Sequence, residues 1–193
     1  MVTHKSMDTR KLVLLSLLTA IVIVLQILAF MVRGPVFSLT LVLVPIVIGA
    51  ALIGPLAGAW LGLVFGAIVL ASGDANVFIA INPIAAVGIV LVRGLMAGLL
   101  AGAVYKLFAE KNKTFATFVA AIISPIINTG LFVAGMYLFF WPTITEWATF
   151  GGYASAATFL FVGMIGFNFL MEMAINITLC PAIVRLVQYG KKA

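Results

Sequence analysis

Long apolar runs constrain the fold of this chain more than any other feature. They cover approximately residues 12–32, 39–54, 56–72, 83–105, 115–140 and 157–187. A helix needs about 20 apolar residues to cross a bilayer. Only 8% of the 193 residues are charged, whereas a soluble domain carries roughly a quarter. The sequence therefore predicts an all-α integral membrane protein, in which residues 1–193 form one transmembrane domain, a bundle of six helices.

The second and third runs are separated at Gly54 and Pro55. The uncharged stretch from Gly34 to Gly73 is too long for one crossing at about 1.5 Å per residue. Proline removes a backbone hydrogen-bond donor, and glycine permits a tight turn. The chain is therefore expected to turn at this point and cross the membrane again.

The distribution of basic residues predicts the orientation. With six crossings, only Arg33 lies on one side, and nine cations share the other: Lys5, Arg10, Lys11, Lys106, Lys111, Lys113, Arg185, Lys191 and Lys192. With five crossings, the best division of the same ten cations is seven to three. Because cytoplasmic segments carry an excess of Lys and Arg, six crossings with both termini in the cytoplasm are favoured. Asp74 and Glu146 then fall in outer loops.

Catalytic and metal-binding motifs are absent from the sequence. There is no phosphate-binding loop, no H-E-x-x-H, and no paired acidic motif of a magnesium-dependent lipid enzyme. Cys180 is the only cysteine and His4 the only histidine, so no internal disulfide and no Cys- or His-based metal site is expected. The sequence predicts neither an enzymatic activity nor a cofactor, and any ATP hydrolysis is expected on a partner.

Ionisable and amide side chains inside the apolar runs mark a candidate binding site. Arg93 and Glu172 lie deep in such runs, and charges in that position usually face a protein interior or a substrate or ion site. Arg93, Asn128 and Asn168 all lie about 15–18 Å from the outer ends of their helices. Asn168, Glu172 and Asn176 follow one stripe of the last helix. These residues predict a polar site near the middle of the membrane.

The sequence leaves the roles of these side chains open. Arg93 and Glu172 can form a buried ion pair that fixes the helix register. Alternatively, Arg93 binds a carboxylate or phosphate of a ligand, and Glu172 is a counter-charge, a structural lock, a proton carrier or the receptor for a cationic group of a ligand. Asn128 and Asn168 can bind hydroxyls or an amide of a ligand, or they can join helices through hydrogen bonds.

Further candidates lie towards the outer surface. Gln26 and Asn82 can line an entrance to the site, although Asn82 before Pro83 is also an ordinary helix start. Residues 34–38 and 73–81 can form a lid. Glycine and proline residues also occur in loops without a function, so these segments can equally be ordinary connections.

Small residues recur every four positions along several helices, at Gly58, Gly62 and Gly66, and at Gly94, Gly98 and Gly102. Such rows let helix backbones approach closely where hydrophobicity does not drive association. We expect them to pack within one bundle. Ser16 and Ala20 form a shorter pair of small residues on the first helix. This pair can contact either another subunit or another helix of the same bundle.

Residues 38–66 resemble the substrate-binding S components of energy-coupling factor (ECF) vitamin transporters. The pattern I-P-I-x-I-G-A-x-x-x-G-P-x-x-G matches Val44 to Gly58, with valine in the first position. The resemblance implies a six-helix bundle in a bacterial plasma membrane that captures a water-soluble vitamin at its outer face. It also implies docking onto a transmembrane coupling subunit that carries two cytoplasmic ATPases. The family's A-x-x-x-A docking motif corresponds to Ser16 and Ala20, with serine in place of the first alanine.

The vitamin has to be inferred from the site, because S components share a fold while they bind different ligands. Arg93 with Asn128 and Asn168 suits a compact anion that bears hydroxyls and an amide, as pantothenate does. Folate is also anionic but would require a more obvious aromatic stacking platform, and riboflavin, thiamine, pyridoxine-type compounds and cobalamin remain open. A stand-alone secondary transporter with Glu172 as proton carrier is an alternative, and a membrane-embedded enzyme or scaffold is a third.

Overall fold

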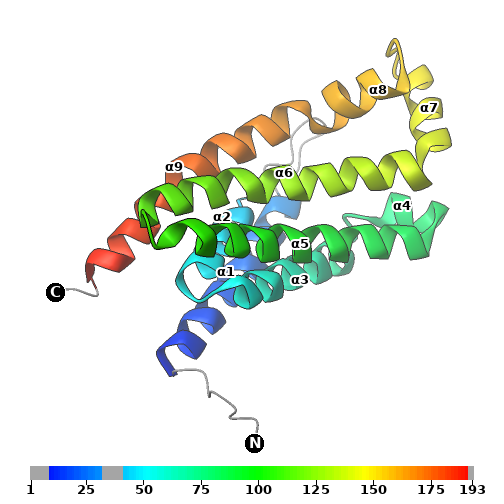
Figure 1. The fold of residues 1–193 in the computed structure, drawn as a ribbon. Helices are drawn as coiled ribbons and strands as arrows, with labels where there is room; N and C mark the ends of the chain where they lie inside the picture. The colour runs from blue at the N-terminus through cyan, green and yellow to red at the C-terminus, as the bar shows by residue number, and fades with distance from the viewer. Residues whose placement is uncertain (1–8, 32–40, 191–193) are drawn as a thin grey trace, which may run out of the picture.

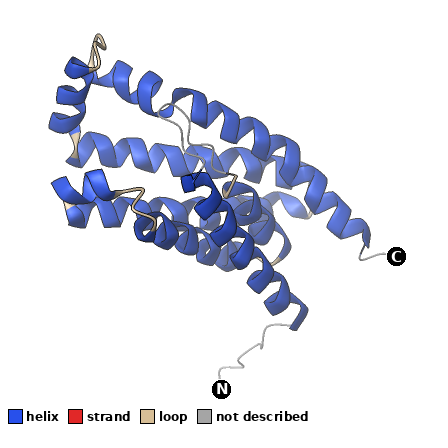
Figure 2. Ribbon diagram, turned by 180° about the vertical axis from the view of Figure 1, so that it is seen from behind, coloured by secondary structure: helices blue, strands red, loops and turns tan. Residues whose placement is uncertain are grey.

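The computed structural model describes residues 9–31 and 41–190, with side chains up to residue 185, and every regular element in these ranges is a helix (Figures 1 and 2). The elements are α1 (Thr9–Met31), α2 (Leu43–Leu52), α3 (Pro55–Ala71), α4 (Asn76–Ile81), α5 (Pro83–Ala109), α6 (Lys113–Phe139), α7 (Trp141–Phe150), α8 (Ala156–Thr158), η1 (Phe159–Gly166) and α9 (Phe167–Gly190). η1 is a π-helical segment that joins α8 to α9. In Figure 1, α4 and α7 lie at one end of the bundle, and the first turn of α1 and the last turn of α9 lie at the other.

Within the described residues, four helical segments are long and apolar enough to cross a membrane: Thr9–Met31, Pro83–Ala109, Lys113–Phe139 and Ala156–Arg185. α2 and α3 are apolar but shorter, with 10 and 17 residues. The prediction of an all-helical, multi-pass membrane protein is confirmed. The count of six crossings stays a prediction.

The helices differ from the predicted runs in three regions. The second run, 39–54, is helical only over Leu43–Leu52, and residues 39 and 40 lie outside the described part. The outer segments that we expected as loops contain α4 and α7. α7 begins at Trp141, and Pro142 lies in its first turn, a position that favours the start of a helix. The last run begins with the π-helical η1, which an uninterrupted apolar run does not indicate.

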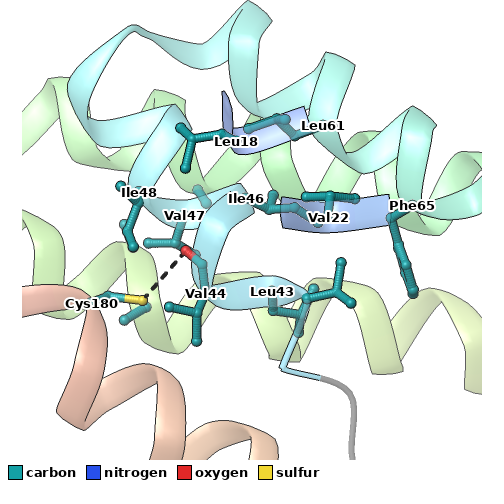
Figure 3. Close-up of a cluster of buried hydrophobic side chains, with 14 of the residues drawn as sticks. Leu18, Val22, Leu43, Val44, Ile46, Val47, Ile48, Leu61, Phe65 and Cys180 are labelled. Carbon is teal, nitrogen blue, oxygen red and sulfur yellow. Dashed lines mark hydrogen bonds between the residues drawn. The ribbon is translucent and has the colours of Figure 1, made fainter. Parts of the chain in front are cut away.

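α2 lies at the centre of the bundle and is buried on every side, from Leu43 to Ala50. Leu18 and Val22 of α1, Leu61 and Phe65 of α3, and Cys180 of α9 pack around it (Figure 3). The Cys180 thiol lies 3.9 Å from the Val44 carbonyl oxygen. Residues Val44 to Gly58 therefore form the buried helix α2, the turn after it and the start of α3. The pattern reflects the packing of the fold and carries no information about the ligand.

α3 and α5 pack with their backbones in direct contact along the two glycine rows. A Cβ atom added to Gly62 would collide with the Gly94 carbonyl oxygen, and one added to Gly94 would collide with the Gly62 carbonyl. Gly58 and Gly98 face each other in the same way. The partner numbers fall on α5 as they rise on α3, so the two helices are antiparallel. The prediction that these rows pack within one bundle is confirmed.

The turn between α2 and α3 depends on the conformation of Gly54. Its φ is 141°, a region that side chains disfavour, and Pro55 follows as the first residue of α3. This confirms the predicted break between the second and third runs.

We expect Gly54→Ala to lower the melting temperature of the purified protein in detergent. A Cβ at Gly54 would meet no atom within 4 Å, so the cost is conformational, about 1–3 kcal/mol. Gly88→Ala is the matched control, because its Cβ also meets nothing within 4 Å and its backbone is helical. Equal melting temperatures of Gly54→Ala and wild type would contradict the requirement for glycine.

Candidate functional site

A cavity of about 190 Å³ is lined by residues of α1, α3, α4, α5, α6, η1 and α9, and by the turn that leads into α4. Its polar lining consists of Gln26, Asp74, Arg93, Asn128, Thr129, Asn168 and Glu172. Its apolar lining includes four phenylalanines, Phe65, Phe78, Phe132 and Phe169, together with Val69, Ala75, Val90, Met164 and Ile165. The cavity thus combines ionisable and amide groups with ring faces.

Five of the six side chains that the sequence singled out for binding line this cavity: Gln26, Arg93, Asn128, Asn168 and Glu172. They come from α1, α5, α6 and α9, so the fold brings distant apolar runs together. Asn82 is not among the lining residues. Its side-chain oxygen accepts a hydrogen bond of 3.1 Å from the Ala85 N–H, as expected of a helix start.

Arg93 is held between two aromatic rings. Its guanidinium carbon lies 5.7 Å from the centre of the Phe65 ring and 5.2 Å from the centre of the Phe132 ring. Both distances fall within the range of cation–π attraction. The carboxylates of Glu172 and, more weakly, Asp74 attract the guanidinium electrostatically. Its buried Nε has no hydrogen-bond partner among the described residues, so at least one N–H donor is available to a ligand.

Two buried amide side chains carry oxygens without a hydrogen-bond partner in the described structure. Gln26 is 1% exposed and Asn128 is 6% exposed, and neither Gln26 Oε1 nor Asn128 Oδ1 has a partner there. The Gln26 Nε2 group donates to Asp74 Oδ2 at 3.4 Å. An unsatisfied buried acceptor costs roughly 1–3 kcal/mol, so these oxygens suit a site that receives ligand donors.

The polar stripe on α9 divides between the cavity and the protein interior. Asn168 and Glu172 line the cavity. Asn176 is buried, and its side-chain amide donates to the Glu172 carbonyl oxygen at 2.8 Å. The Cys180 thiol lies 3.5 Å from Asn176 Oδ1. Asn176 therefore contributes to the packing of the helix.

Several residues that line the cavity were not indicated by the sequence pattern. Asp74 lies outside the apolar runs, and Thr129 and the phenylalanines are ordinary residues for membrane helices. Phe78 of α4 packs against the rings of Phe132, Phe140 and Trp147 at centroid distances of 6.2, 5.2 and 5.8 Å. α4 is thus tied by aromatic contacts to α6 and α7 beside the cavity. In the described ranges, no group of three or more His, Cys, Asp or Glu side chains is arranged to hold a metal ion.

Of the two segments that the sequence suggests as a lid, the structure describes only the second. Residues 34–38 lie outside the described part of the chain. Residues 73–81 contain α4, and Asp74, Ala75 and Phe78 of this segment line the cavity. The segment therefore forms part of the cavity wall, and its opening stays a prediction.

Ser16 and Ala20 both lie exposed on α1. The buried residues of α1 are Leu18, Val22 and Gln26. Ser16 and Ala20 thus belong to the side of α1 that is not packed against the bundle, and Leu17 beside them is 57% exposed.

Comparison with known proteins gives one match. The model of the family described as ECF transporter, substrate-specific component, matches residues 10–184. Neither the search of curated proteins nor that of solved structures gave a match. The family implies a small-molecule substrate together with coupling and ATPase partners in a membrane. Because the match spans nearly the whole sequence, this chain belongs to the substrate-specific component family of ECF transporters.

Proposed function

We propose that this chain is the high-affinity vitamin-binding S component of an ECF-type ABC transporter, and that its best candidate ligand is pantothenate. The observation that carries the proposal is the position of Arg93, between two phenylalanine rings in a cavity that Asn128 and Asn168 also line. Family membership supports a substrate-binding component. The side chains of the cavity support a compact anion.

Pantothenate matches the groups in the cavity. Its carboxylate is a bidentate acceptor for the Arg93 guanidinium, and its hydroxyls and amide can exchange hydrogen bonds with Asn128 and Asn168. Its branched hydrocarbon can pack on the rings of Phe65 and Phe132. The cavity of about 190 Å³ lies below the range of roughly 300–1,000 Å³ for drug-sized ligands, which favours a compact vitamin over folate or cobalamin. Riboflavin, thiamine and pyridoxine-type compounds are the competing ligands.

The proposed topology has six crossings of a bacterial plasma membrane, with both termini in the cytoplasm. Two features support it. The first turn of α1, the last turn of α9 and the α5–α6 connection lie at the same end of the bundle (Figure 1), and the connection is flanked by Lys106, Lys111 and Lys113. Such basic clusters are typical of the cytoplasmic side. The turn at Asp74, with α4 and α7, then lies at the outer side, where a vitamin enters.

The proposed partners are a transmembrane coupling subunit and two cytoplasmic ATPases, which hydrolyse the ATP, so that this chain itself is not an enzyme. We propose that Ser16 and Ala20 form the contact with the coupling subunit. Both are small, exposed and four residues apart on α1, a spacing that allows close approach of another helix.

Ala20→Trp is expected to prevent co-purification with tagged coupling and ATPase subunits, because an indole at this position keeps the partner helix at a distance. The vitamin Kd of the isolated chain should stay unchanged. Ala134→Trp on α6, also an exposed alanine, is the matched control and should leave co-purification intact. A stoichiometric complex with Ala20→Trp would refute the docking role of this face.

Calorimetric titration of the purified chain with pantothenate, riboflavin, thiamine and pyridoxine tests the ligand proposal, which requires pantothenate to bind most tightly. Uptake into liposomes tests the transport proposal. Accumulation should need the coupling subunit, both ATPases and ATP. Uptake by the chain alone, driven by a proton gradient and lost in Glu172→Gln, would instead establish a secondary transporter.

A further inference from the structure

We propose that Asp74 and Gln26 form a second polar subsite of the cavity, which binds hydrogen-bond donor groups of the ligand. The inference rests on the proposed function, because it specifies how the same cavity selects its ligand. The substrate class that follows is a small anion that also carries hydroxyl or N–H groups, in contrast to an anion whose remainder is apolar.

The two residues line the same cavity as Arg93 but come from other elements. Asp74 belongs to the turn before α4 and Gln26 to α1, whereas Arg93 belongs to α5. A ligand whose anionic group binds Arg93 therefore presents its remaining groups to a lining that includes Asp74 and Gln26.

Asp74 and Gln26 present acceptor atoms to the cavity. Gln26 Nε2 donates to Asp74 Oδ2 at 3.4 Å, and Oε1 is the acceptor atom of the same amide. That oxygen is buried and has no hydrogen-bond partner in the described residues, while Gln26 itself is only 1% exposed. A donor group of a ligand would satisfy this oxygen, whereas an apolar or acceptor group would leave it desolvated.

The charges of the cavity lead to the same requirement. Among the described residues, its ionisable lining comprises one cation, Arg93, and two carboxylates, Asp74 and Glu172. Of these three groups, Arg93 attracts an anionic group of a ligand, and Asp74 would repel a second acceptor. The groups of the ligand that approach Asp74 must therefore present hydrogens rather than lone pairs. The two hydroxyls of pantothenate, which lie at the end opposite to its carboxylate, meet this requirement.

Asp74→Asn tests the subsite, because it keeps the size of the side chain and removes its charge. Thermal unfolding in detergent first identifies which of pantothenate, pyridoxine, thiamine and riboflavin stabilises the wild type, and calorimetry then gives Kd. We expect Asp74→Asn to weaken Kd about 10- to 100-fold. Glu146→Gln, which removes an exposed carboxylate on α7 outside the cavity, should leave Kd unchanged. A wild-type Kd in Asp74→Asn overturns the inference.

The two proposals fail in distinguishable ways. If no vitamin stabilises or titrates the wild type, the proposed function fails and the subsite fails with it. If a vitamin binds the wild type and Asp74→Asn equally, only the subsite fails. Should Asp74→Asn not fold, Gln26→Leu, a change of similar volume that removes the unpartnered oxygen, is expected to give the same loss, and an unchanged Kd overturns the inference.

Binding of a second ligand distinguishes direct recognition by Asp74 from a purely structural role of this residue. The probe is the pantothenate analogue in which both hydroxyls are replaced by hydrogen, or the corresponding donor-free analogue of whichever vitamin binds. Direct recognition predicts that the analogue binds the wild type weakly and loses nothing further in Asp74→Asn. The same fold loss for vitamin and analogue would assign Asp74 to the support of the fold and overturn the inference.

Discussion

Arg93→Ala is expected to abolish measurable binding of the anionic vitamin while the bundle stays folded. The guanidinium is the cationic group among the described residues that line the cavity, and its loss would leave the carboxylate of the bound vitamin without a counter-charge. Truncating one partner of a buried charge pair between a protein and its ligand costs about 2–5 kcal/mol of binding free energy, which weakens Kd by about 30-fold or more. Calorimetry gives the Kd, and circular dichroism with size-exclusion chromatography reports the fold.

Two further variants separate a ligand anchor from an ion pair that only fixes the helices. Arg93→Lys keeps the charge but loses the planar fork, so its Kd should lie between those of wild type and Arg93→Ala. Equal Kd values for wild type and Arg93→Ala would contradict the anchor role. If Arg93→Ala unfolds and Glu172→Gln restores the fold, the ion-pair interpretation is correct.

Gly94→Leu is expected to destroy the α3–α5 interface and to give little folded protein. Even a Cβ at this position would collide with the Gly62 carbonyl oxygen, and a backbone atom cannot move aside as a flexible side chain can. Overpacking a core typically costs about 1–3 kcal/mol and occasionally more. The cost here should lie at or above the upper end, because the helices themselves must separate.

The controls for Gly94→Leu are Gly88→Leu on α5 and Gly130→Leu on α6. Both glycines are exposed, and a Cβ at either position meets no atom within 4 Å. These variants should express and melt as the wild type does, as measured by fluorescence-detected chromatography over a temperature series. A Gly94→Leu protein with the wild-type melting temperature would refute the close backbone packing.

The sequence indicated those cavity residues that contrast with their surroundings. Arg93, Asn128, Asn168 and Glu172 are polar groups in apolar helices, and burial of such groups is costly unless they face the protein interior. Asp74 gave no such contrast, because a carboxylate in a polar connecting segment is ordinary. The ring pair around Arg93 was equally hidden, since phenylalanine occurs on lipid-facing and inward-facing positions alike.

The glycine rows and the Gly54 turn were predictable because they depend on residue size and backbone freedom, which follow directly from the residue types and their spacing. The short helices α4 and α7 were not, because they lie in segments without a long apolar run. The π-helical form of η1 was also hidden, since the same apolar residues suit an α-helix. The Val44 to Gly58 pattern indicated the family but not the ligand, because α2 fills the core and lines no part of the cavity.

Binding of a small anionic vitamin through Arg93 is tested most directly by mass spectrometry of the small molecules released from protein purified out of bacterial cells. The wild type is expected to release a stoichiometric amount of a carboxylate-bearing vitamin, pantothenate first, and Arg93→Ala is expected to release none. Release of a cationic or uncharged compound from the wild type, or of the same compound in equal amount from Arg93→Ala, would contradict it.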